Sequence, residues 1–268
     1  MAVLERESGK IFYSVQGKGK GETLLMLRGL GRSSRYWLGF DSLMAHYFQV
    51  VTIDQRGLGR STQPMEWSDS IDTLADDCLA VMDQLNIENF HMFGLSLGGM
   101  IGTSIASMAP DRVLSLVVGA SSSADYKAFR LNPKALARLL FALRAGRFQD
   151  ALLETVVPAM IMRSRGPELQ ASWQKILDQE GFPLLTVLKQ IRASMSHRIK
   201  GRLDSSQYPV MFVHGSMDGF VPLHNSQRLQ RLVPGSVLKI IKGAGHELAL
   251  GFEQELSLVL REFTKAKA

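Results

Sequence analysis

Short apolar runs alternate with longer stretches of helical periodicity along most of this chain. Such alternation is typical of βαβ units and a mostly parallel sheet. The runs are almost continuously apolar, as expected of strands that are covered on both faces. The predicted strands are Thr23–Leu27, Gln49–Ile53, Phe90–Phe93, Leu114–Val118, Pro209–Val213 and Val237–Ile241. A further, antiparallel edge strand is predicted over Lys10–Gln16.

Apolar positions at intervals of three and four residues predict helices between these strands. The predicted helices are Arg35–Tyr47, Ile71–Leu85, Leu97–Met108, Leu223–Leu232 and Glu253–Phe263. The pattern therefore predicts an α/β fold, in which helices flank a mostly parallel, twisted sheet.

The alternation breaks between residues 124 and 204. This segment predicts only helices, at Pro133–Leu143, Phe148–Met162, Glu168–Gln179 and Pro183–Ala193. It is too long for a simple crossover, so we interpret it as a cap over the carboxyl ends of the strands, where open α/β sheets bind ligands. The chain then divides into a core of residues 1–123 and 205–268 and a helical cap, or lid, of residues 124–204.

The composition is that of an ordinary globular enzyme, with 46% hydrophobic and 21% charged residues. No apolar run approaches the ~20 residues of a transmembrane helix, and the segment Met1–Lys10 lacks the apolar centre of a secretory signal. Cys78 is the only cysteine, which excludes a disulfide framework and makes a cytoplasmic location the expectation. The Cys and His spacings fit no metal site, so we expect no metal.

The net charge of +6 is concentrated in the predicted cap, which contains 14 Lys and Arg but 7 Asp and Glu. One interpretation is a solvated basic face. The other is a field that steers anionic substrates or favours peripheral contact with an anionic lipid surface. Without a compact basic run or a known binding motif, nucleic acid is not expected as a partner. The sequence does not indicate an oligomeric state.

The sequence Gly94-Leu95-Ser96-Leu97-Gly98 lies between a predicted strand and a predicted helix. In a G-x-S-x-G turn of this kind, the chain reverses sharply and the serine hydroxyl is exposed in a strained conformation. The flanking glycines avoid collisions across the turn. Because a helix N-terminus follows, free amides can face a developing oxyanion. Ser96 is therefore the predicted nucleophile.

The longer stretch from Gly94 to Gly102 resembles the nucleophile elbow of the α/β-hydrolase superfamily. Within that superfamily the chain is similar to small cofactor-free carboxylesterases and 3-oxoadipate enol-lactonases. The resemblance covers nearly all of the chain except the cap and implies the α/β-hydrolase fold. The turn Asp54–Ser61 matches a structural turn of these enzymes. A serine at position 96 argues against the dehalogenase and epoxide hydrolase branches, in which an aspartate is the nucleophile.

A serine hydroxyl needs a base to remove its proton. Of the six histidines, His246 lies in a glycine-rich loop directly after the last predicted strand, from which an imidazole can reach across the strand ends. His91 and His214 lie within predicted strands, where a structural role is expected. The resemblance also implies that the base lies on the loop of His246.

The base needs a carboxylate to fix its tautomer and to stabilise the imidazolium. Asp218 follows the strand Pro209–Val213, and the sequence around it resembles the acid loop of the family. The order Ser96, Asp218, His246 is also that of the α/β-hydrolase triad. Asp125, after the preceding strand, is a weaker rival.

Two backbone amides should form the oxyanion hole. One is that of Leu97, and the resemblance implies that the other is that of Leu30 in the loop Arg28-Gly29-Leu30-Gly31. The family usually has His-Gly where this chain has Arg28-Gly29, so both residues are substrate-binding candidates. One hypothesis is that Arg28 meets a substrate carboxylate; the alternative is a structural ion pair.

These residues predict a serine hydrolase that cleaves a carboxylic ester of a small or medium acyl group through an acyl-enzyme, without a cofactor. Enzymes that catalyse many different reactions share this fold and this triad. The alternatives are an enol-lactonase, for which a basic cap suits an acidic substrate, a thioesterase, a perhydrolase and a carbon–carbon bond hydrolase. A receptor or scaffold with this fold and without turnover is the non-enzyme alternative.

Overall fold

One sheet organises the fold, and most of its strands are the apolar runs of the sequence. The computed structural model describes residues 2–17, 21–126 and 132–265, except the side chains of Leu140 and Leu143. Within these residues, eight strands lie in the order β1-β2-β4-β3-β5-β6-β7-β8. The strands are β1 Ala2–Arg6, β2 Gly9–Gln16, β3 Thr23–Leu27, β4 Gln49–Ile53, β5 Phe90–Leu95, β6 Val113–Gly119, β7 Val210–Gly215 and β8 Val237–Ile241. From β3 to β8 the strands are parallel, whereas β1 and β2 pair antiparallel.

Helices cover both faces of this sheet, which confirms the predicted fold class. On one face α2 (Ile71–Gln84), α3 (Leu97–Met108) and α8 (His224–Leu232) contribute to the larger apolar core. On the other face α1 (Phe40–Met44) and α9 (Glu253–Lys265) contribute to a second core. Every residue of β3 and β5 is buried, because central parallel strands are covered on both sides.

Two strand predictions are wrong at the sheet edges. β2 is not the edge strand, because β1 pairs along its outer side. The alternating exposed and half-buried residues of β1 gave no continuous apolar run, so the sequence did not reveal it. β8 is not covered on both faces: Val237 is 52% and Ile240 is 42% exposed. As the last strand of the sheet, β8 has only one neighbouring strand.

One helix predicted across Arg35–Tyr47 is in fact two short helices. The 3₁₀ helix η1 spans Ser34–Trp37, and α1 begins at Phe40. Between them Leu38 and Gly39 have φ angles of +50° and +90°. This left-handed backbone ends a right-handed helix. The periodic pattern persists across the break because both helices bury their apolar residues.

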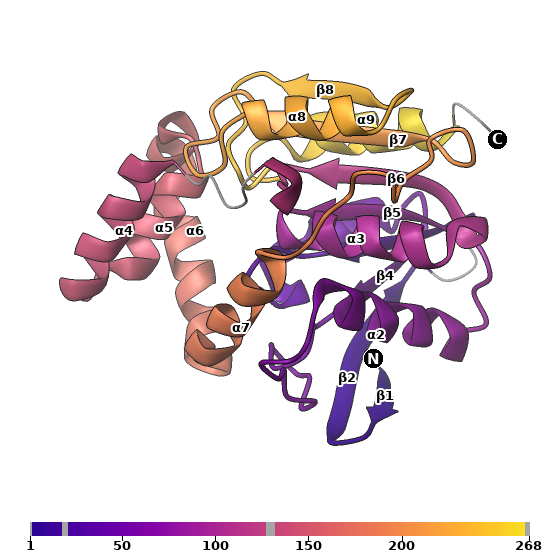
Figure 1. Cartoon of the computed structure of the whole chain (residues 1–268). Coiled ribbons are helices and arrows are strands. Elements are labelled where there is room, and N and C mark those ends of the chain that lie inside the picture. Colours follow the sequence, from indigo (N-terminus) through magenta and orange to yellow (C-terminus); the bar gives the residue numbers. More distant parts are fainter. Residues whose placement is uncertain (1, 18–20, 127–131, 266–268) are drawn as a thin grey trace.

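Helices α4 to α7 lie between β6 and β7 in the chain and form the region predicted as a cap. They are α4 Pro133–Arg144, α5 Phe148–Val156, α6 Ala159–Glu180 and α7 Leu184–Ser194, and the 3₁₀ helix η3 Ala124–Tyr126 precedes them. Figure 1 shows them beside the core, on the side to which the arrowheads of β6 and β8 point. Residues 127–131 of the predicted cap lie outside the described residues.

The break between the second and third of these helices is at Pro158, not near residue 165 as predicted. Val157 is extended, as residues before proline usually are, and α6 begins directly after Pro158. Pro167 lies inside α6 without ending it.

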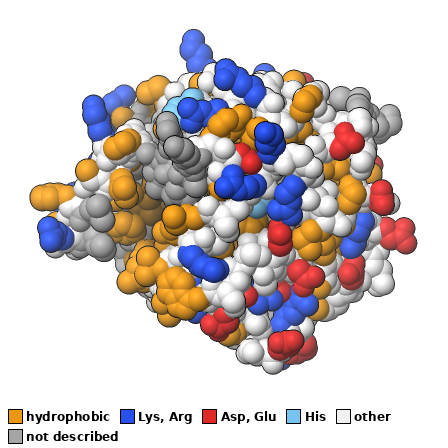
Figure 2. Space-filling model, viewed as in Figure 1, with side chains coloured by type: hydrophobic (Ala, Val, Ile, Leu, Met, Phe, Trp, Pro, Cys, Tyr) orange, Lys and Arg blue, Asp and Glu red, His pale blue; other side chains and the backbone are white. Residues whose placement is uncertain are grey.

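The cap exposes large apolar side chains, including Phe141 on α4 and Leu184, Leu185 and Leu188 on α7. Figure 2 shows such side chains gathered on the cap side, with Lys and Arg spread over the upper part of this face. Among the described residues, the structure contains no helix that is both long and apolar enough to span a bilayer.

Candidate active site

Ser96 is fixed in a sharp turn between β5 and α3. Its φ of +56° and ψ of −116° are rare for a residue with a side chain and cost about 1–3 kcal/mol. The turn is so tight that a Cβ on Gly94 would lie 2.1 Å from the carbonyl oxygen of Gly98. The Ser96 amide donates to the carbonyl of Gly119, and the Ser121 hydroxyl donates to the Ser96 carbonyl, both at 2.7 Å. The predicted elbow thus has the strained geometry that its glycines imply.

Asp218 and His246 form the hydrogen-bonded pair that a general base requires. Asp218 Oδ2 lies 2.9 Å from His246 Nδ1, and Oδ1 accepts the amides of Phe220 and Val221 at 2.8 Å each. Both carboxylate oxygens are therefore held in place. With Nδ1 donating to the carboxylate, Nε2 is left as the acceptor for a proton.

The buried surroundings of His246 act on its pKa in opposite directions. Burial is the largest influence and lowers the pKa, whereas the charge and hydrogen bond of Asp218 raise it, with help from Glu247. The net result is a His246 pKa above its ordinary value of 6.5. Asp218 thus stabilises the imidazolium that proton transfer would create.

A second buried imidazole, that of His214 on β7, contacts the same carboxylate. Its Nε2 lies 3.0 Å from the Val221 carbonyl and 3.3 Å from Asp218 Oδ2, and its Nδ1 lies 2.7 Å from the Ser226 hydroxyl. Burial lowers the pKa of His214 below its ordinary value, which favours the neutral form of this ring. The expected structural role of His214 therefore includes contact with the acid loop, which the sequence alone did not indicate.

The loop after β3 packs directly on the nucleophile. A Cβ on Gly29 would lie 3.2 Å from the Cβ of Ser96, so a side chain here would crowd the serine. Leu30 follows on this loop, and Leu97 begins α3 on the other side of Ser96. Within the described part of the chain, neither the Leu30 nor the Leu97 amide has a recorded hydrogen-bond partner. As far as the described residues go, both predicted oxyanion donors are therefore available to a ligand oxygen.

A cap residue holds this loop from the other side. The fully buried Gln190 of α7 accepts the Gly31 amide through Oε1 at 2.8 Å. Gly31 has a φ of +64°, and a Cβ there would lie 2.5 Å from Val187 Cγ2. The backbone next to Leu30 is thus fixed by close packing of the cap.

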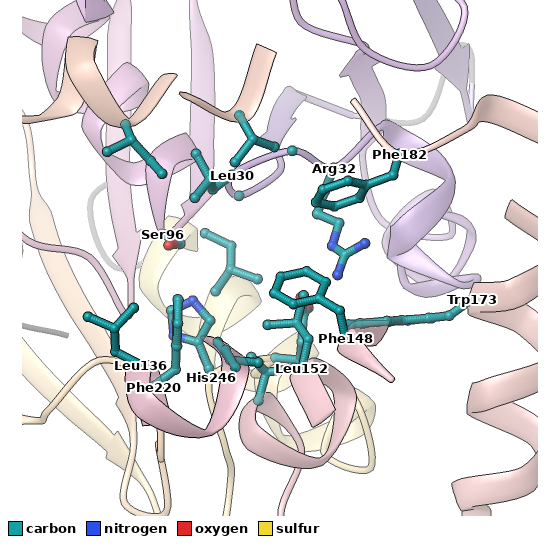
Figure 3. A pocket seen from close by; sticks show the side chains of 18 residues that line it. Leu30, Arg32, Ser96, Leu136, Phe148, Leu152, Trp173, Phe182, Phe220 and His246 are labelled. Atoms are coloured by element: carbon teal, nitrogen blue, oxygen red, sulfur yellow. The ribbon is translucent and has the colours of Figure 1, made fainter. Parts of the chain in front are cut away.

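Ser96 and His246 lie in the wall of one pocket, called the site pocket below, with a volume of about 200 Å³. The cap supplies most of its apolar lining, including Leu136, Phe148, Leu152, Trp173, Phe182 and Val187. Figure 3 shows Ser96 and His246 close together on one side of the pocket, with Phe148, Phe182 and Trp173 across from them. An apolar group can therefore occupy the pocket while a carbonyl faces Ser96.

Arg28, a predicted substrate contact, is instead engaged by the residue after His246. Its Nη2 lies 2.8 and 2.9 Å from the two carboxylate oxygens of Glu247, and its guanidinium stacks on Trp37. Arg28 is 3% exposed and does not line the site pocket, whereas Gly29 does. The geometry therefore favours the structural alternative for Arg28 over contact with a substrate carboxylate.

Sequence reasoning missed three polar residues around the pocket: Arg32, Gln190 and Glu247. Arg32 and Glu247 line the pocket, and Gln190 holds its rim. Glu247 directly follows the predicted base, which was a usable signal. No sequence signal marks Gln190, because its role depends on how the cap packs against the loop after β3.

Comparison with known proteins gives the same family. The model of the alpha/beta hydrolase fold family matches residues 22–251. A putative carbamate hydrolase RutD from Agrobacterium fabrum is 32% identical over 241 residues, which are 87% of this chain and 90% of that protein. A RutD from Caulobacter sp. strain K31 is 28% identical, with 92% of each chain covered.

Solved structures of similar fold align with almost the whole length of this chain. Est816, described as an N-acyl homoserine lactone degrading enzyme, is 29% identical with a TM-score of 0.81, covering 98% of this chain and 100% of its own. The enol-lactonase from Burkholderia xenovorans LB400 is 19% identical with a TM-score of 0.79, covering 98% and 99%, and it supports the fold alone. This chain belongs to the alpha/beta hydrolase fold family.

Proposed function

We propose that this hydrolase cleaves carboxylic esters with an apolar acyl group through a covalent acyl-enzyme. The observation that carries the proposal is the hydrogen bond of 2.9 Å between Asp218 and His246, together with a strained Ser96 that lines one apolar pocket with His246. A serine, a base and an acid that orients the base are the parts that acyl transfer needs. The elbow strain is consistent with a catalytic position, since such strain is concentrated at functional sites.

In the proposed reaction, Ser96 Oγ attacks the ester carbonyl while His246 Nε2 takes the hydroxyl proton. The Leu30 and Leu97 amides donate to the oxyanion of the tetrahedral intermediate. As this intermediate collapses, His246 returns the proton to the leaving alcohol and the acyl group stays on Ser96. Water, deprotonated by His246, then attacks the acyl-enzyme, and His246 returns that proton to Ser96 Oγ as the acid is released.

Esters of apolar acyl groups are favoured because the cap side of the pocket is built from Leu, Val and aromatic residues. Such a lining gains free energy by burying apolar surface. Apart from Arg32 and Glu247, the pocket side chains beyond Ser96 and His246 offer a small polar carbamate few partners, although the RutD relatives are named putative carbamate hydrolases. For this reason we rank ester cleavage above carbamate cleavage.

A lactone is the second candidate, because it is a cyclic ester and opens through the same steps. Est816, which is described as an N-acyl homoserine lactone degrading enzyme, shares 29% identity over nearly the full chain, and its fold is closely similar. Thioester hydrolysis and perhydrolysis would use the same catalytic groups, but no observation favours either reaction.

A fluorophosphonate probe together with a panel of 4-nitrophenyl esters and lactones tests the proposal. We expect the probe to label wild type, and Ser96→Ala to lose labelling and about a thousandfold or more of kcat. Ser164→Ala, on the exposed surface of α6, is the matched control and should behave as wild type. An unlabelled wild type that cleaves no ester or lactone would favour the receptor or scaffold alternative.

A further inference from the structure

Arg32 places a positive charge against the site pocket. The residue is 7% exposed and lines the pocket together with Ser96 and His246. Figure 3 shows its guanidinium reaching towards the interior from the side opposite Ser96, among Phe148, Phe182 and Trp173. The charge therefore lies where the distal part of a bound acyl group would end.

The guanidinium of Arg32 contacts two aromatic rings and hydrogen-bonds the Tyr36 side chain, but among the described residues it contacts no carboxylate. Its Cζ lies 4.3 Å from the centre of the Tyr36 ring and 4.1 Å from that of Trp173. Arg32 forms no ion pair with any of the described residues, whereas the neighbouring Arg28, Arg35 and Arg60 each form one. Buried cations are usually paired, because removing a charge from water costs free energy that only a close counter-charge or several hydrogen bonds offset.

Among the described residues, Glu247 acts on Arg32 and Glu180 acts on its partner Tyr36, and both carboxylates are already engaged. Glu247 offers both oxygens to Arg28, at 2.8 and 2.9 Å. Glu180 accepts the Ser33 hydroxyl at 2.9 Å and lies 3.6 Å from Arg35. Burial lowers the pKa of Arg32, and the Tyr36 phenol and Glu247 oppose this only in part. Arg32 is therefore a cation whose counter-charge the described residues do not supply.

We propose that the substrate supplies this counter-charge, as a carboxylate at the far end of its apolar acyl chain. Stacking on Tyr36 and Trp173 fixes the plane of the Arg32 guanidinium. The N–H groups of a guanidinium can donate two parallel hydrogen bonds to one carboxylate. This inference rests on the proposed function. It narrows the class of substrate to half-esters, or carboxylated lactones, in which an apolar chain separates the ester from the carboxylate.

The catalytic test compares two substrate series of increasing chain length. The first is 4-nitrophenyl half-esters of α,ω-dicarboxylic acids, and the second is the same molecules with the carboxylate capped as a methyl ester. We expect wild type to prefer the acid at one optimal length. Arg32→Met should lower that preference, measured as the ratio of kcat/KM values, by roughly 10- to 100-fold, as expected for a lost charged hydrogen bond. Arg32→Lys should retain part of it.

The control is Arg163→Met on the exposed surface of α6, which should keep the wild-type ratio. Circular dichroism checks folding, and Arg32→Gln replaces Arg32→Met if that variant does not fold. A wild type that does not distinguish the two series at any length would overturn the inference. So would an Arg32 variant that slows both series equally.

A binding test separates this inference from the proposed function. Isothermal titration of Ser96→Ala with the half-amides of the same dicarboxylic acids, which cannot turn over, should give tighter binding than Ser96→Ala/Arg32→Met. If the half-amides bind in an Arg32-dependent manner but wild type cleaves no ester, the proposed function fails and the anion site stands. If Arg32 has no influence on binding at any length, the anion site is wrong even where esters are cleaved.

Discussion

Ser96, Asp218 and His246 lie on three separate loops, and each is held by contacts of its own. The Ser96 backbone is fixed by Gly119 and Ser121, and Asp218 is held by two amides of its own turn. Positions that are fixed before the substrate binds need little reorganisation during the reaction, which is the basis of electrostatic catalysis.

Asp218→Asn tests the acid at the residue scale. The amide has nearly the same shape but cannot stabilise an imidazolium, and it favours the wrong tautomer of His246. We expect kcat for a 4-nitrophenyl ester to fall by about 10³–10⁴-fold, with the fold retained. Asp111→Asn, on the surface, is the matched control. An Asp218→Asn variant within a few-fold of wild type would show that this carboxylate does not assist the base.

The pH dependence of kcat/KM tests the electrostatics of His246. Only the neutral imidazole can accept the Ser96 proton, so activity should rise as the pH increases through the pKa of the free enzyme. Since Asp218 and Glu247 raise that pKa above 6.5 despite burial, the midpoint of the rise should lie above 6.5. A midpoint below 6.5, measured with a substrate that does not itself titrate, would contradict this arrangement.

At the scale of elements, the cap is joined to the catalytic loops by defined contacts. Gln190 of α7 bonds to Gly31 in the loop after β3, and the carbonyl of Val156 at the end of α5 accepts the Glu247 amide at 3.1 Å. The loops that carry the proposed oxyanion donor Leu30 and the proposed base His246 are thus both bonded to helices of the predicted cap. The cap therefore contributes to the position of these loops as well as to the pocket lining.

Gln190→Met tests the first of these contacts. Methionine keeps most of the volume but cannot accept the Gly31 amide, so the Leu30 donor should be held less firmly. We expect kcat to fall by roughly tenfold or more, with little change in KM, because the oxyanion forms only after binding. The surface variant Gln174→Met controls for the substitution. An increase in KM alone would instead assign Gln190 to substrate binding.

The Arg28–Glu247 pair links the end of β3 to the loop of His246. Arg28→Met would leave a buried carboxylate without its partner, so we expect a loss of about 3–5 kcal/mol in the free energy of unfolding. Replacing Glu247 with Met as well should restore most of this loss, because two apolar side chains leave no buried charge. Urea denaturation measures both, and equal stability of Arg28→Met and wild type would contradict the assignment.

At the scale of the whole molecule, the sequence predicted what depends on local pattern. Central strands were recognisable because burial on both faces makes them apolar throughout, and the glycines around Ser96 marked a turn that tolerates no side chain. β1 was missed because an edge strand need not form a continuous apolar run, and the exposed face of β8 was missed because Val237 and Ile240 are apolar although exposed.

The place of the pocket followed from the predicted cap, but the roles of individual lining residues could not be predicted from the sequence, because distant segments meet there. Arg28 and Arg32 are four residues apart on one loop, yet one pairs with Glu247 and the other faces the pocket. Their roles are decided by Glu247 and by Trp173 of α6, more than 140 positions away along the chain. No periodic pattern contains that information.

The central claim is that Ser96 carries the acyl group during turnover. Its most direct test is acid quenching of a reaction with a 4-nitrophenyl ester, followed by peptide mass spectrometry. We expect a burst of 4-nitrophenol and an acyl adduct on the Ser96 peptide of wild type, with neither in Ser96→Ala. An acyl group on another residue, or full turnover by Ser96→Ala, would contradict the account.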